Sequence, residues 1–94
     1  MNEEKTALAL SLVKARLNRL DAALDDYLKA RIGAAYEYLE NQGIHLDMES
    51  SRDLMLVVDT AVYQYSNRDA DKGEPDWLRY QRRQRWLMER GDQA

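Results

Sequence analysis

The chain has 94 residues, of which 45% are hydrophobic and 33% charged, and its formal net charge at pH 7 is −3. This length and composition are typical of one small globular domain and exclude an intrinsically disordered chain. The lack of cysteine excludes disulfides, a thiolate nucleophile and a cysteine-based zinc site. No stretch approaches the ~20 apolar residues that a membrane-spanning helix needs, so we expect no membrane partner.

Charge is unevenly distributed along the chain. Residues 1–76 carry 9 Lys and Arg against 15 Asp and Glu, whereas residues 77–90 carry five Arg against one Glu. Such asymmetry predicts that the C-terminal end docks on an acidic surface, which in a homo-oligomer is the acidic part of the next copy.

The first expected helix is short. Residues 1–10 are expected to form a flexible N-terminal arm, and Ser11 is a plausible N-cap for a helix over 11–19. One face of this helix collects its apolar side chains: Leu10, Val13, Leu17 and Leu20.

A second helix is expected over 22–42. Asp21 is a good N-cap, and Gly43 stands where a C′ glycine closes a helix. Its apolar stripe comprises Leu24, Leu28, Ile32, Ala35 and Leu39. Arg31 falls inside this stripe, so it either lays its stem on the core with its head in water or is partly buried and paired with an acid.

The most apolar stretch, 54–65, predicts a third helix over 51–67. Ser50 and Asp53 have the spacing of a capping box, and the run without Gly or Pro is too long for an ordinary strand. Leu56 and Tyr63 form a second, narrower apolar stripe on the far side of this helix. A helix that is apolar on two sides is usually central. The second stripe therefore packs either on the rest of this chain or on another subunit.

A polar connector is expected between the third and fourth helices, over 66–74. It contains four charged residues close together: Asp69, Asp71, Lys72 and Glu74. Such composition is typical of a solvated loop, yet nine residues are long for a loop in so small a domain, and long loops often carry function.

The last expected helix, over 75–90, begins at Pro75, because proline is favoured in the first turn. The side expected to face the core carries Trp77, Tyr80, Gln81, Gln84, Leu87 and Met88. The opposite side carries Trp86 among Arg79, Arg82, Arg83 and Arg90. Tryptophan and arginine are frequent interface anchors. Trp86 therefore docks on another protein, contacts nucleic acid, or is covered by its own arginines and the N-terminal arm.

No catalytic constellation stands out. Asp25 and Asp26 are adjacent and point in different directions on a helix, so they cannot act as an acid–base pair. His45 is the only histidine, lies in the connector 44–49 and belongs to no motif. We therefore expect no enzymatic activity, no metal and no cofactor.

The order of these features resembles the small head–tail connector proteins of tailed phages and prophages, also called head-completion or adaptor proteins. The resemblance covers about residues 10–88 and is carried by 10–17, 21–35, 54–65 with 67–69, and the restart at 75–78 before an arginine-rich helix. It implies an all-α fold of about four helices. It also implies a structural subunit that forms a homo-oligomeric ring under the portal protein and extends the DNA channel.

The resemblance also assigns roles to residues. In similar proteins the C-terminal helix or tail grips the portal, and a loop between the later helices faces the channel. Here those roles would fall on Trp86 with its four neighbouring arginines and on the loop 66–74. The implied location is the virion head–tail junction, after assembly in the host bacterial cytoplasm, with tail-side connector proteins as further partners and DNA only as passing cargo.

Two other functions are compatible with the residues. The basic C-terminal helix could serve a small nucleic-acid-binding regulator, although no base-reading pattern stands out on it. Alternatively, Trp86 could anchor an adaptor or inhibitor that binds a host protein.

Overall fold

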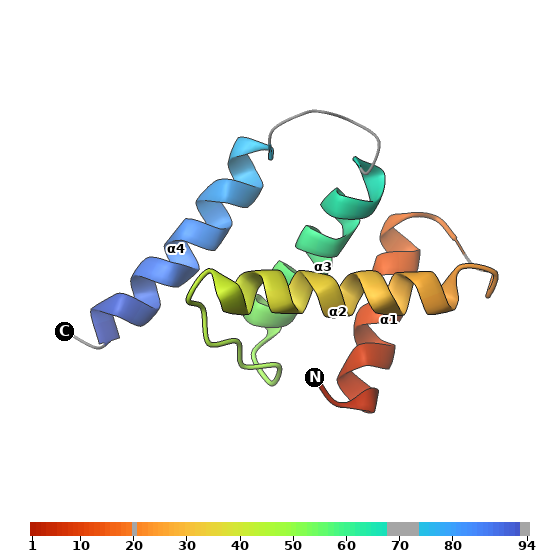
Figure 1. Cartoon of the computed structure of the whole chain (residues 1–94), viewed down its shortest axis with the longest axis horizontal. Coiled ribbons are helices and arrows are strands. Elements are labelled where there is room, and N and C mark those ends of the chain that lie inside the picture. Colours follow the sequence, from red (N-terminus) through yellow and green to blue (C-terminus); the bar gives the residue numbers. More distant parts are fainter. Residues whose placement is uncertain (20, 68–73, 93–94) are drawn as a thin grey trace.

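The computed structural model describes residues 1–19, 21–67 and 74–92, and this part of the chain contains four α-helices and no strand. The helices are α1 (Glu3–Arg16), α2 (Asp25–Asn41), α3 (Ser51–Ser66) and α4 (Asp76–Asp92) (Figure 1). The all-helical fold class expected from the sequence is therefore confirmed.

The N-terminal arm expected over residues 1–10 is instead most of helix α1. The side chain of Asn2 caps this helix by accepting a hydrogen bond from the backbone N–H of Lys5 at 2.8 Å. The acidic residues of the first turn suit the positive end of the helix dipole. Three α1 side chains are buried: Ala9, Leu10 and Val13. Ser11, expected as the N-cap, is exposed inside the helix.

Helix α2 begins later than expected but ends as the sequence predicts. Its N-cap residue is Leu24, which makes no side-chain capping bond, and Asp21 lies in the preceding turn. Gly43 follows the helix with φ of +91°, the left-handed conformation expected of a C′ glycine. A Cβ at Gly43 would also lie 2.9 Å from Nη2 of Arg90 and 3.3 Å from Nε1 of Trp86, so helix α4 approaches the chain closely there.

Helix α3 is the centre of the fold. Ser50 caps it by accepting a hydrogen bond from the backbone N–H of Asp53 at 3.5 Å, as the capping-box spacing predicts. Helix α3 packs against all three other helices. Its buried residues are Asp53, Leu54, Leu56, Val57, Val58, Thr60 and Ala61.

Helices α1, α2 and α3 enclose the core, and α4 leans away from them (Figure 1). The backbone of α4 comes close to α3 and to no other helix. Leu78 is the one α4 residue in the apolar core of the described chain, with 1% of its surface exposed. The way α4 is attached therefore decides which of its faces is open to a partner.

Candidate functional site

Helix α4 is rotated relative to the sequence expectation. Its buried residues are Leu78, Arg85 and Glu89, and Trp86 is half-buried. The large apolar residues expected to face the core are instead exposed: Trp77 by 51%, Tyr80 by 66%, Leu87 by 43% and Met88 by 43%. The predicted core face of this helix is therefore its outer face.

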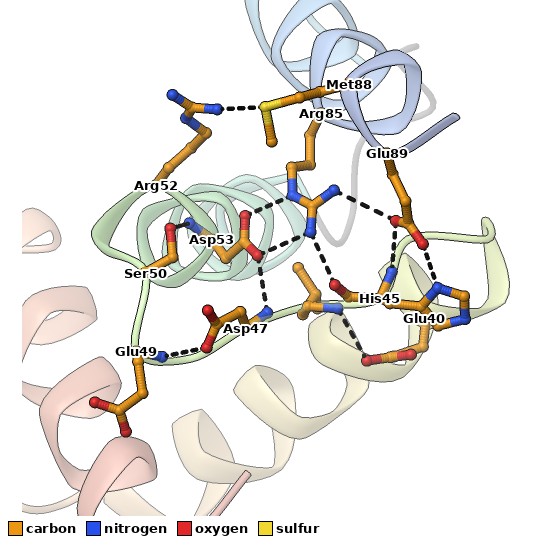
Figure 2. Close-up of polar contacts among 11 residues, drawn as sticks. Glu40, His45, Asp47, Glu49, Ser50, Arg52, Asp53, Arg85, Met88 and Glu89 are labelled. Carbon is orange, nitrogen blue, oxygen red and sulfur yellow. Dashed lines mark hydrogen bonds and ion pairs between the residues drawn. The ribbon is translucent and has the colours of Figure 1, made fainter. Parts of the chain in front are cut away.

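Arg85 anchors the inner face of α4 to the bundle (Figure 2). Its Nε donates to Oδ1 of Asp53 at 2.7 Å, and its Nη2 donates to Oδ2 of Asp53 at 3.1 Å. Nη2 also donates to the backbone carbonyl of His45 at 2.8 Å, and Nη1 donates to Oε2 of Glu89 at 3.3 Å. The hydrogen bond with Asp53 raises the pKa of the Arg85 guanidinium above its ordinary value. This bidentate pair is nearly buried and fixes the rotation of α4 about its axis.

Glu89 ties the C-terminal half of α4 to the connector between α2 and α3. The backbone N–H of His45 donates to Oε2 of Glu89 at 2.8 Å, and Nδ1 of His45 contacts Oε1 (Figure 2). The backbone hydrogen bond from His45 is the main cause that lowers the pKa of Glu89 below its ordinary value. His45 is thus part of the support of α4, a role that its isolated position in the sequence did not indicate.

The interface between α3 and α4 is also polar nearer the start of α4, at Gln81. Nε2 of Gln81 donates to Oδ2 of Asp59 at 3.4 Å. Asp59 also forms an ion pair with Arg16 of α1. Because these contacts are directional, they orient α4 without requiring its apolar residues to face inward.

The residues predicted to dock on a partner are largely engaged within the chain. The Arg90 guanidinium lies 4.9 Å from the ring centre of Trp86, and Trp86 packs against the core. Arg82 forms an ion pair with Glu74 and donates to the hydroxyl of Tyr38 at 3.2 Å. This arrangement matches the alternative in which Trp86 is covered by the chain itself, although α2 and the following connector, not an N-terminal arm, supply the cover.

Two of the predicted arginines remain available on α4. Arg79 and Arg83 are exposed, and Nη2 of Arg79 makes only a long hydrogen bond, 3.5 Å, to the carbonyl of Glu74 among the contacts described. On the helix both lie on the side away from Arg85; Arg83 is next to Tyr80 and Leu87, and Arg79 lies further round, towards Trp86.

The other predicted site residues divide into three groups. Leu56 is fully buried in the core of this chain, so its expected contact with another subunit is corrected to a core contact. Tyr63 is half-buried and packs against that core. Asp69, Asp71 and Lys72, assigned to a channel-facing loop, lie outside the described residues, whereas Glu74 is described and pairs with Arg82.

The question of a partner for Arg31 is also answered. Its Nη1 donates to Oε1 of Gln64 at 3.3 Å, and its guanidinium lies 6.0 Å from the ring centre of Tyr27. An amide and an aromatic ring, and not an acid, are thus the partners that the structure gives to this half-buried arginine.

An open groove of about 740 Å³ lies along the exposed apolar side of α4, where that side meets α3. Its lining residues are Arg52, Leu56, Trp77, Tyr80, Gln81, Gln84, Arg85, Leu87 and Met88. Nη1 of Arg52 lies 2.8 Å from Sδ of Met88 and closes one side of the groove (Figure 2). Exposed arginines therefore flank an apolar strip on both sides, with Arg52 on one side and Arg79 and Arg83 on the other. We call this strip with its three arginines the α4 outer face.

Within residues 1–19, 21–67 and 74–92, no group of three or more His, Cys, Asp or Glu side chains is placed to hold a metal ion. In the same part of the chain, no helix is long and apolar enough to cross a membrane. The α4 outer face offers apolar surface and positive charge for contact with another macromolecule.

Comparisons with known proteins add no assignment: no protein-family model, no curated protein and no solved structure matches the chain.

Proposed function

We propose that this chain is a structural head–tail connector subunit of a tailed phage or prophage. In this role, copies form a ring under the portal protein that extends the DNA channel and joins head to tail. The resemblance of residues 10–88 to that family supplies the specific class. The observation that carries the proposal is the α4 outer face, on which four large apolar side chains are 43–66% exposed.

The α4 outer face is more apolar than ordinary protein surface, and buried polar contacts hold its apolar side chains toward solvent. Scattered single apolar residues on a surface need no explanation, but a contiguous patch beside a groove marks an interaction site. Here the ion pair of Arg85 with Asp53 holds the patch outward. A helix that depended on apolar packing would bury the same residues, so the polar support favours an assembly role for them.

The proposed partners follow from the charge distribution. Arg52, Arg79 and Arg83 suit an acidic rim on the portal, on a tail-side connector protein or on a second copy. The acidic loop 66–74 would face the channel, where negative charge repels the phosphates of passing DNA. The docking role predicted for Trp86 moves in this proposal to Trp77 and Tyr80, whichever of these partners covers the face, because Trp86 already packs within its own chain.

A nucleic-acid-binding regulator is less well supported. Arg82 and Arg85 are engaged in ion pairs with Glu74, Asp53 and Glu89, which reduces the positive charge available for phosphates. An adaptor for a host protein would use the same α4 outer face, so only the identity of the partner separates it from the connector.

Co-assembly with the portal tests the proposal. We would purify the chain with the portal encoded in the same genome and determine the mass of the complex by native mass spectrometry. The connector predicts a defined complex with about one chain per portal subunit, and Tyr80→Asp abolishes it while the exposed α2 control Ala34→Asp does not. A wild-type chain that gives no portal complex contradicts the proposal, and retention on DNA that falls steeply with salt would favour the regulator.

A further inference from the structure

Helix α4 lies at one end of the longest dimension of the chain, which spans 46 Å, and α1 lies in the other half, where the start of α2 extends beyond it (Figure 1). No Cα atom of α1 lies within 8 Å of α4. A head-to-tail assembly requires two different surfaces that lie apart on one subunit, because each copy then contributes a different patch to each junction.

The exposed side of α1 complements the α4 outer face in shape. Between the exposed residues Ala7, Ser11 and Ala15 there is a depression of about 380 Å³ that also involves Leu10, Lys14 and Arg19. Small side chains at this spacing leave room for bulky ones from a neighbouring helix. Leu8, which is 43% exposed, lies beside the depression and adds an apolar contact.

The two faces also complement each other in charge. Glu3 and Glu4 are exposed in the first turn of α1, whereas Arg79 and Arg83 are exposed on α4. At the other end of α1, Nζ of Lys14 is paired with Oδ1 of Asp25 at 2.9 Å and Arg19 is exposed, so the attraction is confined to the first turn.

We propose that the occupant of the α4 groove is helix α1 of a second copy of this chain. Trp77 and Tyr80 of one copy fill the depression on α1 of the next. Leu8 of that next copy enters the groove, while its Glu3 and Glu4 face Arg79 and Arg83. The proposal rests on the ring in the proposed function and identifies the two surfaces that form each junction.

Engineered cysteines test this junction without background, because the chain contains no cysteine. We would prepare Leu8→Cys and Tyr80→Cys as separate proteins and mix them at high concentration under oxidising conditions. A disulfide needs Cα atoms within about 7 Å. The proposal predicts a mixed disulfide dimer in at least severalfold higher yield than from Ala34→Cys mixed with Tyr80→Cys, the matched control on exposed α2. Equal yields would overturn it.

The double variant Leu8→Cys/Tyr80→Cys tests the head-to-tail geometry. Because α1 and α4 of one chain are too far apart for a disulfide, oxidation should give a ladder of covalent multimers, or closed rings, that reducing agent returns to monomer. A product that stops at the dimer would indicate a two-fold symmetric contact and would overturn the proposed junction.

A charge exchange tests the role of the glutamates. Glu3→Lys/Glu4→Lys added to the Leu8→Cys protein should lower the cross-linking yield severalfold, and Arg79→Glu/Arg83→Glu in the Tyr80→Cys protein should restore it. No loss of cross-linking, or no restoration of it, would overturn the assigned register.

Portal binding measured in parallel separates the two proposals. A normal portal stoichiometry without the mixed disulfide between the Leu8→Cys and Tyr80→Cys proteins would overturn the junction alone, whereas loss of portal binding by the wild type would overturn the connector function.

Discussion

Replacing Arg85 by methionine should destabilise the fold by about 3 kcal/mol, because it removes one partner of a nearly buried ion pair. The Asp53 side chain is only 3% exposed and would lose two charged hydrogen bonds, at 2.7 and 3.1 Å. Each such bond contributes roughly 1.5–3 kcal/mol. Asp53 still accepts a hydrogen bond from the backbone N–H of Asp47 at 2.8 Å. We therefore expect a loss of stability at the lower end of the range given by the sum of the two bonds.

Thermal denaturation followed by circular dichroism measures this loss. For a domain of this size, about 3 kcal/mol corresponds to a decrease in Tm of roughly 12–24 °C. The matched control is Arg83→Met, an exposed arginine on the same helix, which should change the free energy of unfolding by no more than about 0.5 kcal/mol.

A double-mutant cycle separates the pair from its surroundings. Asp53→Leu/Arg85→Met removes both charges of the pair together and should recover much of the stability that Arg85→Met loses, because the Asp53 carboxylate is no longer left buried without its arginine. The reasoning would be refuted if Arg85→Met lost no more stability than Arg83→Met, or if the losses of the two single variants simply added.

Four further substitutions test other parts of the structure, each by denaturation. Gly43→Ala should cost about 1–3 kcal/mol because φ is +91° and a Cβ would lie 2.9 Å from an α4 side-chain atom. Gly33→Ala, where a Cβ meets nothing within 4 Å, should gain about 0.5–1 kcal/mol, and equal effects at the two glycines would contradict this. Leu56→Ala should cost about 2–5 kcal/mol as a core truncation, and an unchanged Tm would return Leu56 to an intersubunit contact. The hydrogen bond from the backbone N–H of His45 is the main cause that lowers the pKa of Glu89. The ionised Glu89 side chain therefore stabilises the fold above its unfolded-state pKa, and this stabilisation is lost as the pH falls through its folded-state pKa. The stability advantage of the wild type over Glu89→Gln should therefore shrink on acidification, and a pH-independent difference would refute the assignment.

Local rules were sufficient to predict the helices and several of their ends. The capping-box spacing of Ser50 and Asp53 located the start of α3 correctly, and Gly43 located the end of α2. These features depend on residues a few positions apart, so their physics is contained in a short stretch of sequence.

The start of the N-terminal helix was predicted eight residues too late, because the capping signal at Asn2 was not recognised. Asn2 stands three residues before Lys5, the usual distance between an N-cap side chain and the backbone donor it satisfies. The buried side chains Ala9 and Leu10 then gain stability from α2 and α3, which a search restricted to local composition does not reveal.

The orientation of α4 could not be predicted because it depends on contacts distant in sequence. An apolar stripe normally indicates the buried face of a helix. Here Arg85 reaches Asp53, 32 residues earlier, and Glu89 reaches His45, 44 residues earlier. The i, i+4 spacing of Arg85 and Glu89 was the one local sign of an ion pair, and it did not reveal that both residues are buried.

The central claim is that assembly covers the α4 outer face, and the two tryptophans of the chain permit a direct measurement. In a Trp86→Phe variant, the remaining fluorescence comes from Trp77, which is 51% exposed in the single chain. In a Trp77→Phe variant it comes from Trp86, which is already half-buried. Acrylamide quenching would be compared before and after formation of the portal complex. The account predicts that Trp77 becomes strongly protected and shifts to shorter emission wavelength while Trp86 changes little; protection of Trp86 with Trp77 still open to quencher would contradict it.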